Sequence, residues 1–381
     1  MTERRILRGR GFVAGSIHDD VIVVIEDGRF ADVRLAVRPS DPEPNLGDGL
    51  MVPGFIDVHV HGAAGADFMD GDPEATRRVC QAHLREGTTA LAATTLSGSR
   101  EAIAAALQSA FAVAERPGSA EAAIVAVNLE GPYLSPAKAG AQDPASLRSA
   151  SIEEVDSWLA LGRGGLPWLM TVAPEVHGVL SLIESFHDRV HFSVGHTSAD
   201  YAQTVQAIAA GARHMTHMFN AMPPLHHRDP GPVGAFALDD RCTVELIADG
   251  IHLHPAVLHM IASMFSDRAV LVTDAMRACG LEEGTYKLYR HDVRVSGGAA
   301  RLADGTLAGS VLTMREAVRN MVELAGVPIE SVLPLATEIP ARLLGIDGAR
   351  GWLAAGYEAD LLVLSERFEL QKIFCRGNEV R

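Results

Sequence analysis

A regular alternation of short apolar runs with helical segments covers the chain from residue 53 to residue 275. Each run precedes a stretch rich in Ala, Leu and Glu, which is typical of repeated βα units and a parallel sheet. Eight such units predict an α/β fold, a TIM (β/α)8 barrel, whose catalytic groups sit at the carboxyl ends of the strands. The predicted strands are Phe55–His61, Ala90–Leu96, Ile124–Glu130, Leu169–Glu175, Val190–His196, His214–Asn220, Thr243–Asp249 and Ala269–Ala275. Residues 280–309 predict an inserted hairpin, and helices are expected near 311–325 and 329–344.

The two ends of the chain show short extended runs separated by turns rich in Gly and Pro. We expect these runs to join in one small β-sandwich domain of residues 1–52 and 350–381, beside a catalytic barrel domain of residues 53–349. The runs are Val21–Ile25, Phe30–Leu35, Ala359–Leu364 and Leu370–Cys375.

Composition limits the partners of the chain. With 381 residues, 48% of them hydrophobic, it is long enough for a large core. The charged N-terminal segment lacks the apolar run of a signal peptide, and no later run approaches a membrane-spanning length, so we expect a cytoplasmic protein without a membrane partner. A net charge of −15 repels phosphate backbones, which argues against nucleic acid and requires a locally positive pocket for an anionic substrate. The four cysteines are far apart, so neither a disulfide framework nor a thiolate zinc cluster is indicated.

Polar side chains end nearly every predicted strand. His59 and His61 are two residues apart, so on a strand both imidazoles point the same way and can bind one metal ion. Such a pair also arises by chance, and only its context decides. Ionisable groups that converge at a barrel mouth are costly unless a cation or a substrate offsets them. The strand-end residues are His59, His61, Thr94, Thr95, Glu130, Glu175, His196, His217, Asp249 and Asp274.

Glu130, His196 and His217 predict a metal site of one glutamate and two histidines. Glu130 ends an apolar run, and its carboxylate suits one ion or a bridge between two, although a glutamate before Gly-Pro is also a common turn residue. A single strand-end histidine is usually structural, whereas two on adjacent strands favour a metal site. His191 and His214 face the opposite side of their strands, which favours packing or surface roles.

Asp274 follows the buried run Val-Leu-Val-Thr at the end of the eighth predicted strand. A carboxylate there could take a proton from a metal-bound water during attack and return it to the leaving group. The alternative is a helix N-cap, a position that aspartate favours. The neighbouring histidines favour the catalytic role.

Several motifs resemble the amidohydrolase superfamily and, more narrowly, the N-acetylglucosamine-6-phosphate deacetylases. The resemblance spans nearly the whole chain. Many binuclear amidohydrolases bridge their metals with a carboxylated lysine after the fourth strand, but here that strand ends Val-Ala-Pro-Glu, so the resemblance assigns this place to Glu130. The motifs are Pro-Gly-Phe-Ile-Asp-Val-His-Val-His-Gly at 53–62, Leu-Glu-Gly-Pro-Tyr-Leu at 129–134, Gly-His-Thr-Ser at 195–198, Thr-His-Met-Phe-Asn-Ala-Met-Pro-Pro at 216–224, Ile-Ala-Asp-Gly-Ile-His at 247–252, Val-Thr-Asp-Ala at 272–275, Leu-Ala-Gly-Ser-Val-Leu-Thr-Met at 307–314 and Gly-Trp-Leu-Ala-Ala-Gly-Tyr-Glu-Ala-Asp at 351–360.

The resemblance implies that Glu130, His196 and His217 hold the principal divalent metal, and that His59 and His61, with Glu130, hold a second ion where one is present. Zinc is the expected metal, with iron, manganese or cobalt as alternatives. A metal-bound water would attack the acetamide of N-acetyl-D-glucosamine 6-phosphate, with the aspartate of the eighth strand as general base and then general acid. The products would be D-glucosamine 6-phosphate and acetate.

The resemblance also implies a substrate-binding set and a homodimer. Arg228 and His252 match phosphate-binding positions, one of them serving a neighbouring subunit. Without the resemblance, Arg228 would be interpreted as a solvated charge in a loop. Gln142 stands where several relatives carry a histidine that contacts the substrate, so the galactosamine isomer or another N-acyl amino sugar stays an alternative substrate. A non-catalytic scaffold is a third reading, which the complete ligand set disfavours. The remaining substrate-binding candidates are Ala141, Asn220, Ala221, Leu307, Ala308 and Gly309.

Overall fold

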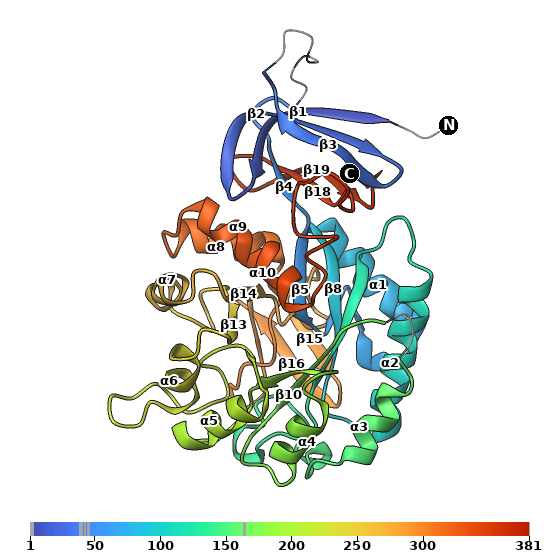
Figure 1. The fold of residues 1–381 in the computed structure, drawn as a ribbon. Coiled ribbons are helices and arrows are strands. Elements are labelled where there is room, and N and C mark those ends of the chain that lie inside the picture. The colour runs from blue at the N-terminus through green and yellow to red at the C-terminus, as the bar shows by residue number, and fades with distance from the viewer. Residues whose placement is uncertain (1–3, 38–40, 42, 44–45, 163–164, 381) are drawn as a thin grey trace.

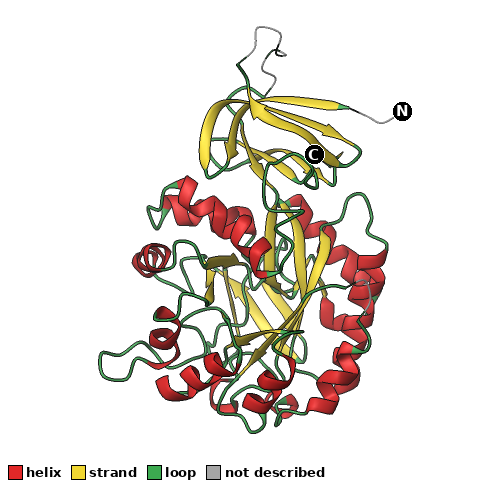
Figure 2. Ribbon diagram, in the orientation of Figure 1, coloured by secondary structure: helices red, strands yellow, loops and turns green. Residues whose placement is uncertain are grey.

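The computed structural model describes residues 4–37, 41, 43, 46–162 and 165–380. A barrel of parallel strands lies inside a layer of helices, and a separate sheet formed by both ends of the chain sits against one end of the barrel (Figure 1). Figure 2 shows how completely strands form the inside of the barrel and helices the outside. This arrangement confirms the predicted TIM barrel with an added β domain.

Eight parallel strands follow one another around the barrel in chain order. The ring closes where the N–H of Asp274, just after β14, donates to the carbonyl of His59 in β5 at 2.9 Å. The strands are buried on both faces, and every residue of β8 and β9 is buried, which explains why they appear in the sequence as continuous apolar runs. The strands are β5 (Phe55–Val60), β8 (Thr88–Thr95), β9 (Ala123–Glu130), β10 (Trp168–Val172), β11 (His191–Val194), β12 (His214–Met215), β13 (Thr243–Ile247) and β14 (Ala269–Val272).

Most of the barrel strands end earlier than predicted, and β11, β12 and β14 each stop two residues before a residue of the predicted site. His196, His217 and Asp274 have φ angles of 45°, 25° and 48°. Residues other than glycine adopt this left-handed region rarely, and often at functional sites. An extended run cannot continue through such a residue, so the predictions for β11, β12 and β14 were too long at this end.

Several helices begin at side chains that bind their free N–H groups. Asp72 accepts the N–H of Ala75 at the start of α1, and Thr313 and Glu316 form a reciprocal capping box at α8. The predicted helix over 329–344 is broken at Thr337, whose φ of −134° and ψ of −76° are not helical. The helices are α1 (Pro73–Arg85), α2 (Arg100–Glu115), α3 (Ile152–Leu159), α4 (Val179–Phe186), α5 (Tyr201–Ala210), α6 (Gly231–Ala237), α7 (Pro255–Met264), α8 (Met314–Glu323), α9 (Ile329–Ala336) and α10 (Glu338–Leu343). Within the described part of the chain, none of the helices is long and apolar enough to cross a membrane.

The second sheet joins both ends of the chain in the order β20-β19-β18-β4-β1-β2-β3. Neighbouring strands are antiparallel except for the parallel pair β1 and β4. Val23, Phe30 and Leu361 belong to a core of its own. Only Gly54 separates β4 from β5, so the chain passes directly from this sheet into the barrel. The strands are β1 (Arg5–Val13), β2 (Ser16–Glu26), β3 (Arg29–Leu35), β4 (Leu50–Pro53), β18 (Leu361–Leu364), β19 (Leu370–Cys375) and β20 (Asn378–Glu379).

The insertion after β14 forms a small antiparallel sheet, one strand larger than the predicted hairpin. Its side chains pack with Leu96, Met276 and Ala308, which lie after β8 and β14. The insertion therefore covers the end of the barrel where the strands finish. Its strands are β15 (Gly284–Leu288), β16 (His291–Ser296) and β17 (Ala299–Arg301). Short elements elsewhere are β6 (Gly62–Ala63), β7 (Ala66–Asp67), η1 (Phe68–Asp70), η2 (Pro136–Lys138) and η3 (Pro144–Ser146).

Candidate active site

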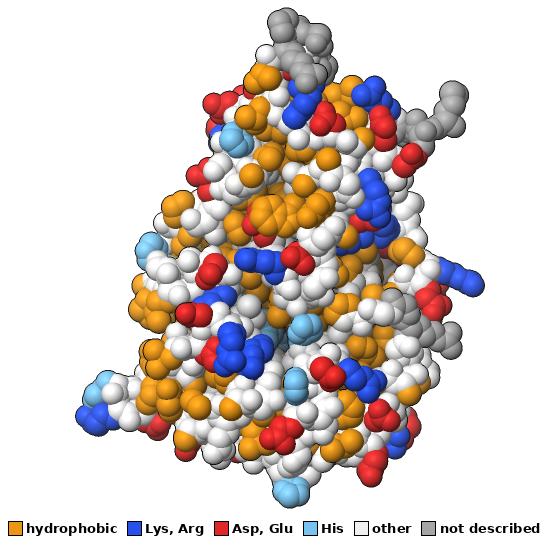
Figure 3. Space-filling model, viewed as in Figure 1, with side chains coloured by type: hydrophobic (Ala, Val, Ile, Leu, Met, Phe, Trp, Pro, Cys, Tyr) orange, Lys and Arg blue, Asp and Glu red, His pale blue; other side chains and the backbone are white. Residues whose placement is uncertain are grey.

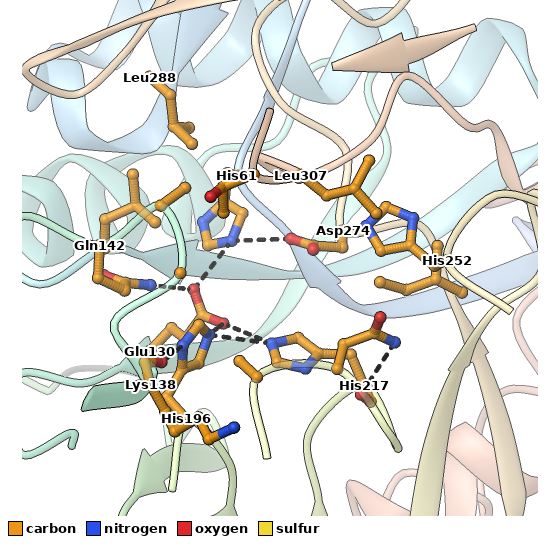
Figure 4. Close-up of a pocket in the computed structure, with 18 of the residues that line it drawn as sticks. His61, Glu130, Lys138, Gln142, His196, His217, His252, Asp274, Leu288 and Leu307 are labelled. Atoms are coloured by element: carbon orange, nitrogen blue, oxygen red, sulfur yellow. Dashed lines mark hydrogen bonds and ion pairs between the residues drawn. The ribbon is translucent and has the colours of Figure 1, made fainter. Parts of the chain in front are cut away.

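The predicted metal ligands converge at the carboxyl ends of the barrel strands (Figure 4). Each is buried, from 0% exposed for His59 to 8% for Asp274. They form two adjacent groups whose nitrogen and oxygen atoms lie close enough to bind one cation each. The groups are Glu130, His196 and His217, and His59, His61 and Asp274.

The carboxylate of Glu130 lies at the centre of the first group. Its Oε1 is 3.0 Å from His196 Nε2 and 3.1 Å from His217 Nε2, and these two nitrogens are 3.1 Å apart. Its Oε2 is 3.3 Å from His61 Nε2. One carboxylate oxygen and two imidazole nitrogens are a typical ligand set for a catalytic divalent metal.

His59 and His61 point the same way, as their spacing predicts, with their Nε2 atoms 3.3 Å apart. Asp274 Oδ1 lies 3.2 Å from His61 Nε2 and 3.6 Å from His59 Nε2. Because Glu130 touches both groups, a second cation here would lie next to the first.

The charges of the cluster favour bound cations. Burial raises the pKa of Glu130, but the positive charge of His59 and His196 holds it well below its ordinary value. Burial also raises the pKa of Asp274, but the hydrogen bond from His61 and the positive charges of His59 and His61 together lower it below its ordinary value. Burial lowers the pKa of His61, yet Asp274 and Glu130 raise it to about 9. The carboxylates therefore hold protons on the imidazoles, and a divalent cation bound to the same atoms would replace those protons. The donor set fits zinc, iron, manganese or cobalt.

A pocket of about 470 Å³ opens above the ligands. Figure 4 shows Leu288 and Leu307 on one side of it and Lys138 and His196 on the other. Leu307 and Gly309 line the pocket, whereas Ala308 between them is 0% exposed and packs into the core of the insertion. The predicted substrate-binding residues that line the pocket are Ala141, Gln142, Asn220, Ala221, His252, Leu307 and Gly309.

Gln142 contacts the ligand cluster directly. Its Nε2 donates to Oε2 of Glu130, and its Oε1 accepts the N–H of Ser97 at 2.7 Å. Since both ends of the amide are occupied, its donor end is fixed toward Glu130. Gln142 therefore has a structural contact with a predicted metal ligand, Glu130, in addition to its place in the pocket wall.

His252 is held by Asp249, which sequence reasoning placed only at a strand end. His252 Nδ1 is 2.6 Å from Asp249 Oδ2, and its backbone N–H donates to Oδ1 at 2.8 Å. Burial raises the pKa of Asp249, but the hydrogen bond from His252, its charge and the backbone N–H groups of Ile251 and His252 together lower it below its ordinary value. The imidazole is thus fixed by an ionised carboxylate at the edge of the pocket (Figure 4).

Arg228 lies outside the pocket of its own chain. It belongs to the loop before α6, of which residues 224–229 are exposed, and this loop stands away from the barrel (Figure 1). Its Nη1 is 2.6 Å from His227 Nε2. Figure 3 shows basic and histidine side chains gathered at the tip of this projection. The described residues that line the pocket do not include Arg228.

Sequence reasoning missed positive and polar groups of the pocket wall, namely Lys138, Arg301 and Thr306. Lys138 lies four residues before Gln142 in the loop after β9, and it is one of only three lysines, which was the available signal. Arg301 and Thr306 come from the insertion, whose position over the barrel the sequence does not indicate. Lys138 and Arg301 supply the local positive charge that an anionic substrate requires.

Sequence reasoning also missed Glu245 in β13, which lies between His59 and His214. The signal was a carboxylate inside an apolar strand. His191 and His214 were predicted to have packing or surface roles. His214 is buried, which leaves the packing role for it, whereas His191 is exposed. Glu175 accepts hydrogen bonds from Thr197 and Ser198 and so shapes the loop after β11.

Known proteins are similar in sequence to nearly the whole chain. The Amidohydrolase family matches residues 50–380. The chain is 38% identical to N-acetylgalactosamine-6-phosphate deacetylase of Escherichia coli O157:H7, covering 98% of this chain and 97% of that protein. It is also 38% identical to N-acetylglucosamine-6-phosphate deacetylase of Bacillus subtilis (strain 168), covering 93% of this chain and 91% of that protein.

Solved structures share the fold. N-acetyl-D-glucosamine-6-phosphate deacetylase from Mycobacterium smegmatis, as a mutant in complex with N-acetyl-D-glucosamine-6-phosphate, superposes with a TM-score of 0.93 at 34% identity, covering 99% of each chain. The N-acetylglucosamine-6-phosphate deacetylase from Thermotoga maritima gives a TM-score of 0.88 at 32% identity, again covering 99% of each chain. The chain therefore belongs to the amidohydrolase family and, within it, to the group that contains the N-acetylglucosamine-6-phosphate deacetylases.

Proposed function

We propose that the protein hydrolyses the acetamide of N-acetyl-D-glucosamine 6-phosphate, with a divalent metal, to D-glucosamine 6-phosphate and acetate. The observation that carries this proposal is the convergence of Glu130, His196 and His217 with Asp274 at the floor of one pocket. Relatives that match over the full length are named for this reaction or for its galactosamine counterpart.

The residues divide the chemistry between them. Glu130, His196 and His217 would hold the cation, for which we propose zinc, and the cation would polarise the amide carbonyl and favour ionisation of a water molecule. Asp274 is ionised, so it is placed to accept a proton from the attacking water and to donate it to the amine nitrogen as the C–N bond breaks. Acetate and the free amine are then the products.

The phosphate end requires positive charge away from the metal ligands. His252, Lys138 and Arg301 line the same pocket and support binding of a phosphate there. Arg228 would contribute from a second copy of the chain, because its loop stands away from the barrel and Arg228 does not line the pocket of its own chain.

A homodimer follows from this role of Arg228. Helices α7 and α8 lie on the same side of the barrel as this loop (Figure 1). Met260, Met264 and Leu324 are 45%, 50% and 53% exposed. Neighbouring exposed apolar side chains of this kind mark interaction surfaces, which supports association of two copies here.

N-acetyl-D-galactosamine 6-phosphate is a second candidate substrate, because a relative of equal identity is named for it. We would measure acetate release from both sugar phosphates and from unphosphorylated N-acetylglucosamine, using zinc-loaded protein. The glucosamine phosphate should give the highest kcat/KM. The unphosphorylated sugar should be at least about tenfold poorer, because hydrogen bonds to a charged group contribute about 1.5–3 kcal/mol each. Equal rates with and without phosphate would contradict the proposed phosphate site, and no acetate from any substrate would overturn the function.

A further inference from the structure

Glu245 is a carboxylate buried inside the barrel, below the pocket. It is the central residue of β13, is 1% exposed, and has the apolar neighbours Val244 and Leu246 in sequence. An ionised group in such a place is costly unless several partners satisfy it. Its presence in the core therefore has to be explained by what it contacts.

The contacts of Glu245 all lead to the metal-ligand cluster. Its Oε2 is 2.9 Å from Nδ1 of His59 and accepts the backbone N–H of His217 at 2.9 Å. Its Oε1 is 2.9 Å from Nε2 of His214, whose Nδ1 lies 2.6 Å from the hydroxyl of Thr243. The carboxylate of Glu245 thus contacts one residue of each cation group, His59 and His217. His214 contacts its other oxygen, Oε1.

The contact with His59 determines which ring nitrogen is available to a metal. A carboxylate at Nδ1 requires a proton on that nitrogen, and this leaves the lone pair on Nε2. Nε2 is the atom that faces the second cation group, 3.3 Å from His61 Nε2 and 3.6 Å from Asp274 Oδ1. A histidine that binds a metal through one ring nitrogen usually donates the N–H of its other ring nitrogen to a carboxylate, a carbonyl or water. This outer partner fixes the ring and increases its basicity.

The other ligating histidines have weaker outer partners. His61 Nδ1 faces the carbonyl of Thr94 at 3.3 Å, and His196 Nδ1 faces the carbonyl of Lys138 at 2.9 Å. His217 Nδ1 has no hydrogen-bond partner among the described residues. Among these four histidines of the described chain, only His59 has a carboxylate, that of Glu245, at its Nδ1.

We propose that Glu245 is a positioning residue that enables His59, His61 and Asp274 to hold a second divalent cation. The proposal rests on the metal-dependent function proposed above. Glu245 orients His59 through its Nδ1 and braces His217 through its backbone, so the second site depends strongly on Glu245 and the first only weakly.

The test is a zinc titration of chelator-stripped protein against a competing chromophoric chelator, with metal content measured by mass spectrometry. Wild-type protein should bind two Zn²⁺ per subunit. In Glu245→Leu, binding of the second Zn²⁺ should weaken by at least about 10–100-fold, the usual cost of losing such an outer partner, while the first stays bound. Glu245→Gln retains one acceptor oxygen for His59 and should give an intermediate loss. It also preserves shape, so it serves if the leucine variant fails to fold.

Glu121→Gln is the matched control, because Glu121 is also buried, at 5% exposure, but contacts Arg77 and Gln81 before the other end of β9. It should bind two Zn²⁺ as wild type does. The proposal is overturned if the Glu245 variants bind the second Zn²⁺ as tightly as wild type, even with a lower melting temperature, or if wild type binds only one. Failure of the function itself would appear separately, as zinc-loaded wild type that releases no acetate.

Discussion

Asp274 Oδ1 lies 3.2 Å from Nε2 of His61, so the proposed general base is paired with a ligand of the second cation group. Their hydrogen bond lowers the pKa of Asp274 against the effect of burial. The carboxylate is therefore ionised when substrate binds, which is the state that a base requires. The pair also connects proton transfer to the occupancy of the His59 and His61 site.

Replacing Asp274 by asparagine should remove proton transfer while keeping the shape of the site. We expect kcat to fall by about 10²–10⁴-fold, the usual contribution of a general acid–base group, with a smaller change in KM. The cation held by Glu130 should remain, which metal analysis of the variant would show. Asp240→Asn is the control, since that side chain is 99% exposed, and it should behave as wild type. A variant at Asp274 with nearly full kcat would contradict the assigned role.

Arg228 should act on the pocket of a partner subunit. Arg228→Ala should raise KM for the sugar phosphate, and Asp274→Asn should be inactive. When the two variants are mixed and allowed to exchange subunits, a hybrid dimer has one site with Asp274 intact and Arg228 supplied by the partner.

Random pairing should restore about one site in four at low substrate concentration. The measurement is the initial rate before and after subunit exchange, with each variant exchanged against itself as the control. A rate equal to the mean of the two variants would show that Arg228 does not act across an interface.

The amide of Gln142 should stabilise the fold as well as the site. Gln142→Leu leaves the N–H of Ser97 and one oxygen of Glu130 without this partner, and both residues are buried. The free energy of unfolding of metal-free protein should fall by about 1–3 kcal/mol, the cost of an unsatisfied buried group. Urea denaturation measures this fall. Gln108→Leu, at an exposed position of α2, should change it little, and equal stability of both variants would disprove the contact.

His83 should make the protein less stable in mild acid. Burial lowers the pKa of His83 to about 4, while its hydrogen bond to the carbonyl of Gly62 acts in the opposite direction. As the pH falls below about 6.5, His83 takes up a proton in the unfolded chain but stays neutral in the folded protein. The free energy of unfolding is therefore lost progressively as the pH falls from about 6.5 to about 4. The shift corresponds to a loss of roughly 3 kcal/mol from this residue.

Glutamine at position 83 keeps an N–H donor but does not titrate. The free energy of unfolding of His83→Gln should therefore fall less steeply over this pH range than that of wild type. His187→Gln, at an exposed position, should leave the wild-type slope unchanged. Identical slopes for all three proteins would show that His83 is not responsible.

The barrel and the convergence of most of the candidate metal ligands were predictable from the sequence. Strands that are covered on both faces appear as apolar runs, and parallel strands bring their carboxyl ends to one side. Glu130, His196 and His217 therefore had to converge once the runs were recognised as strands. The left-handed conformation of His196 and His217 was not predictable, because local sequence does not show the turn that each ligand makes after its strand.

The rest of the site depends on contacts between distant segments. Arg301 reaches the pocket only because the insertion folds back over the barrel. The periodicity of the sequence predicts strands in the insertion but not where they pack. Glu245 lies 186 positions from His59 in the sequence, and alternation along β13 shows which face it takes but not its partner. Asp249 was identified as a strand-end carboxylate, yet its contact with His252 appeared only in three dimensions.

The most direct test of the account is acetate release from N-acetyl-D-glucosamine 6-phosphate by one preparation in three states: as purified, stripped with a chelator, and reloaded with zinc. Acetate and D-glucosamine 6-phosphate should form in equal amounts, the rate should vanish on stripping, and reloading should restore it. Undiminished hydrolysis by fully stripped protein, or no hydrolysis by zinc-loaded protein, would contradict the assignment of Glu130, His196 and His217 as the metal ligands of a deacetylase.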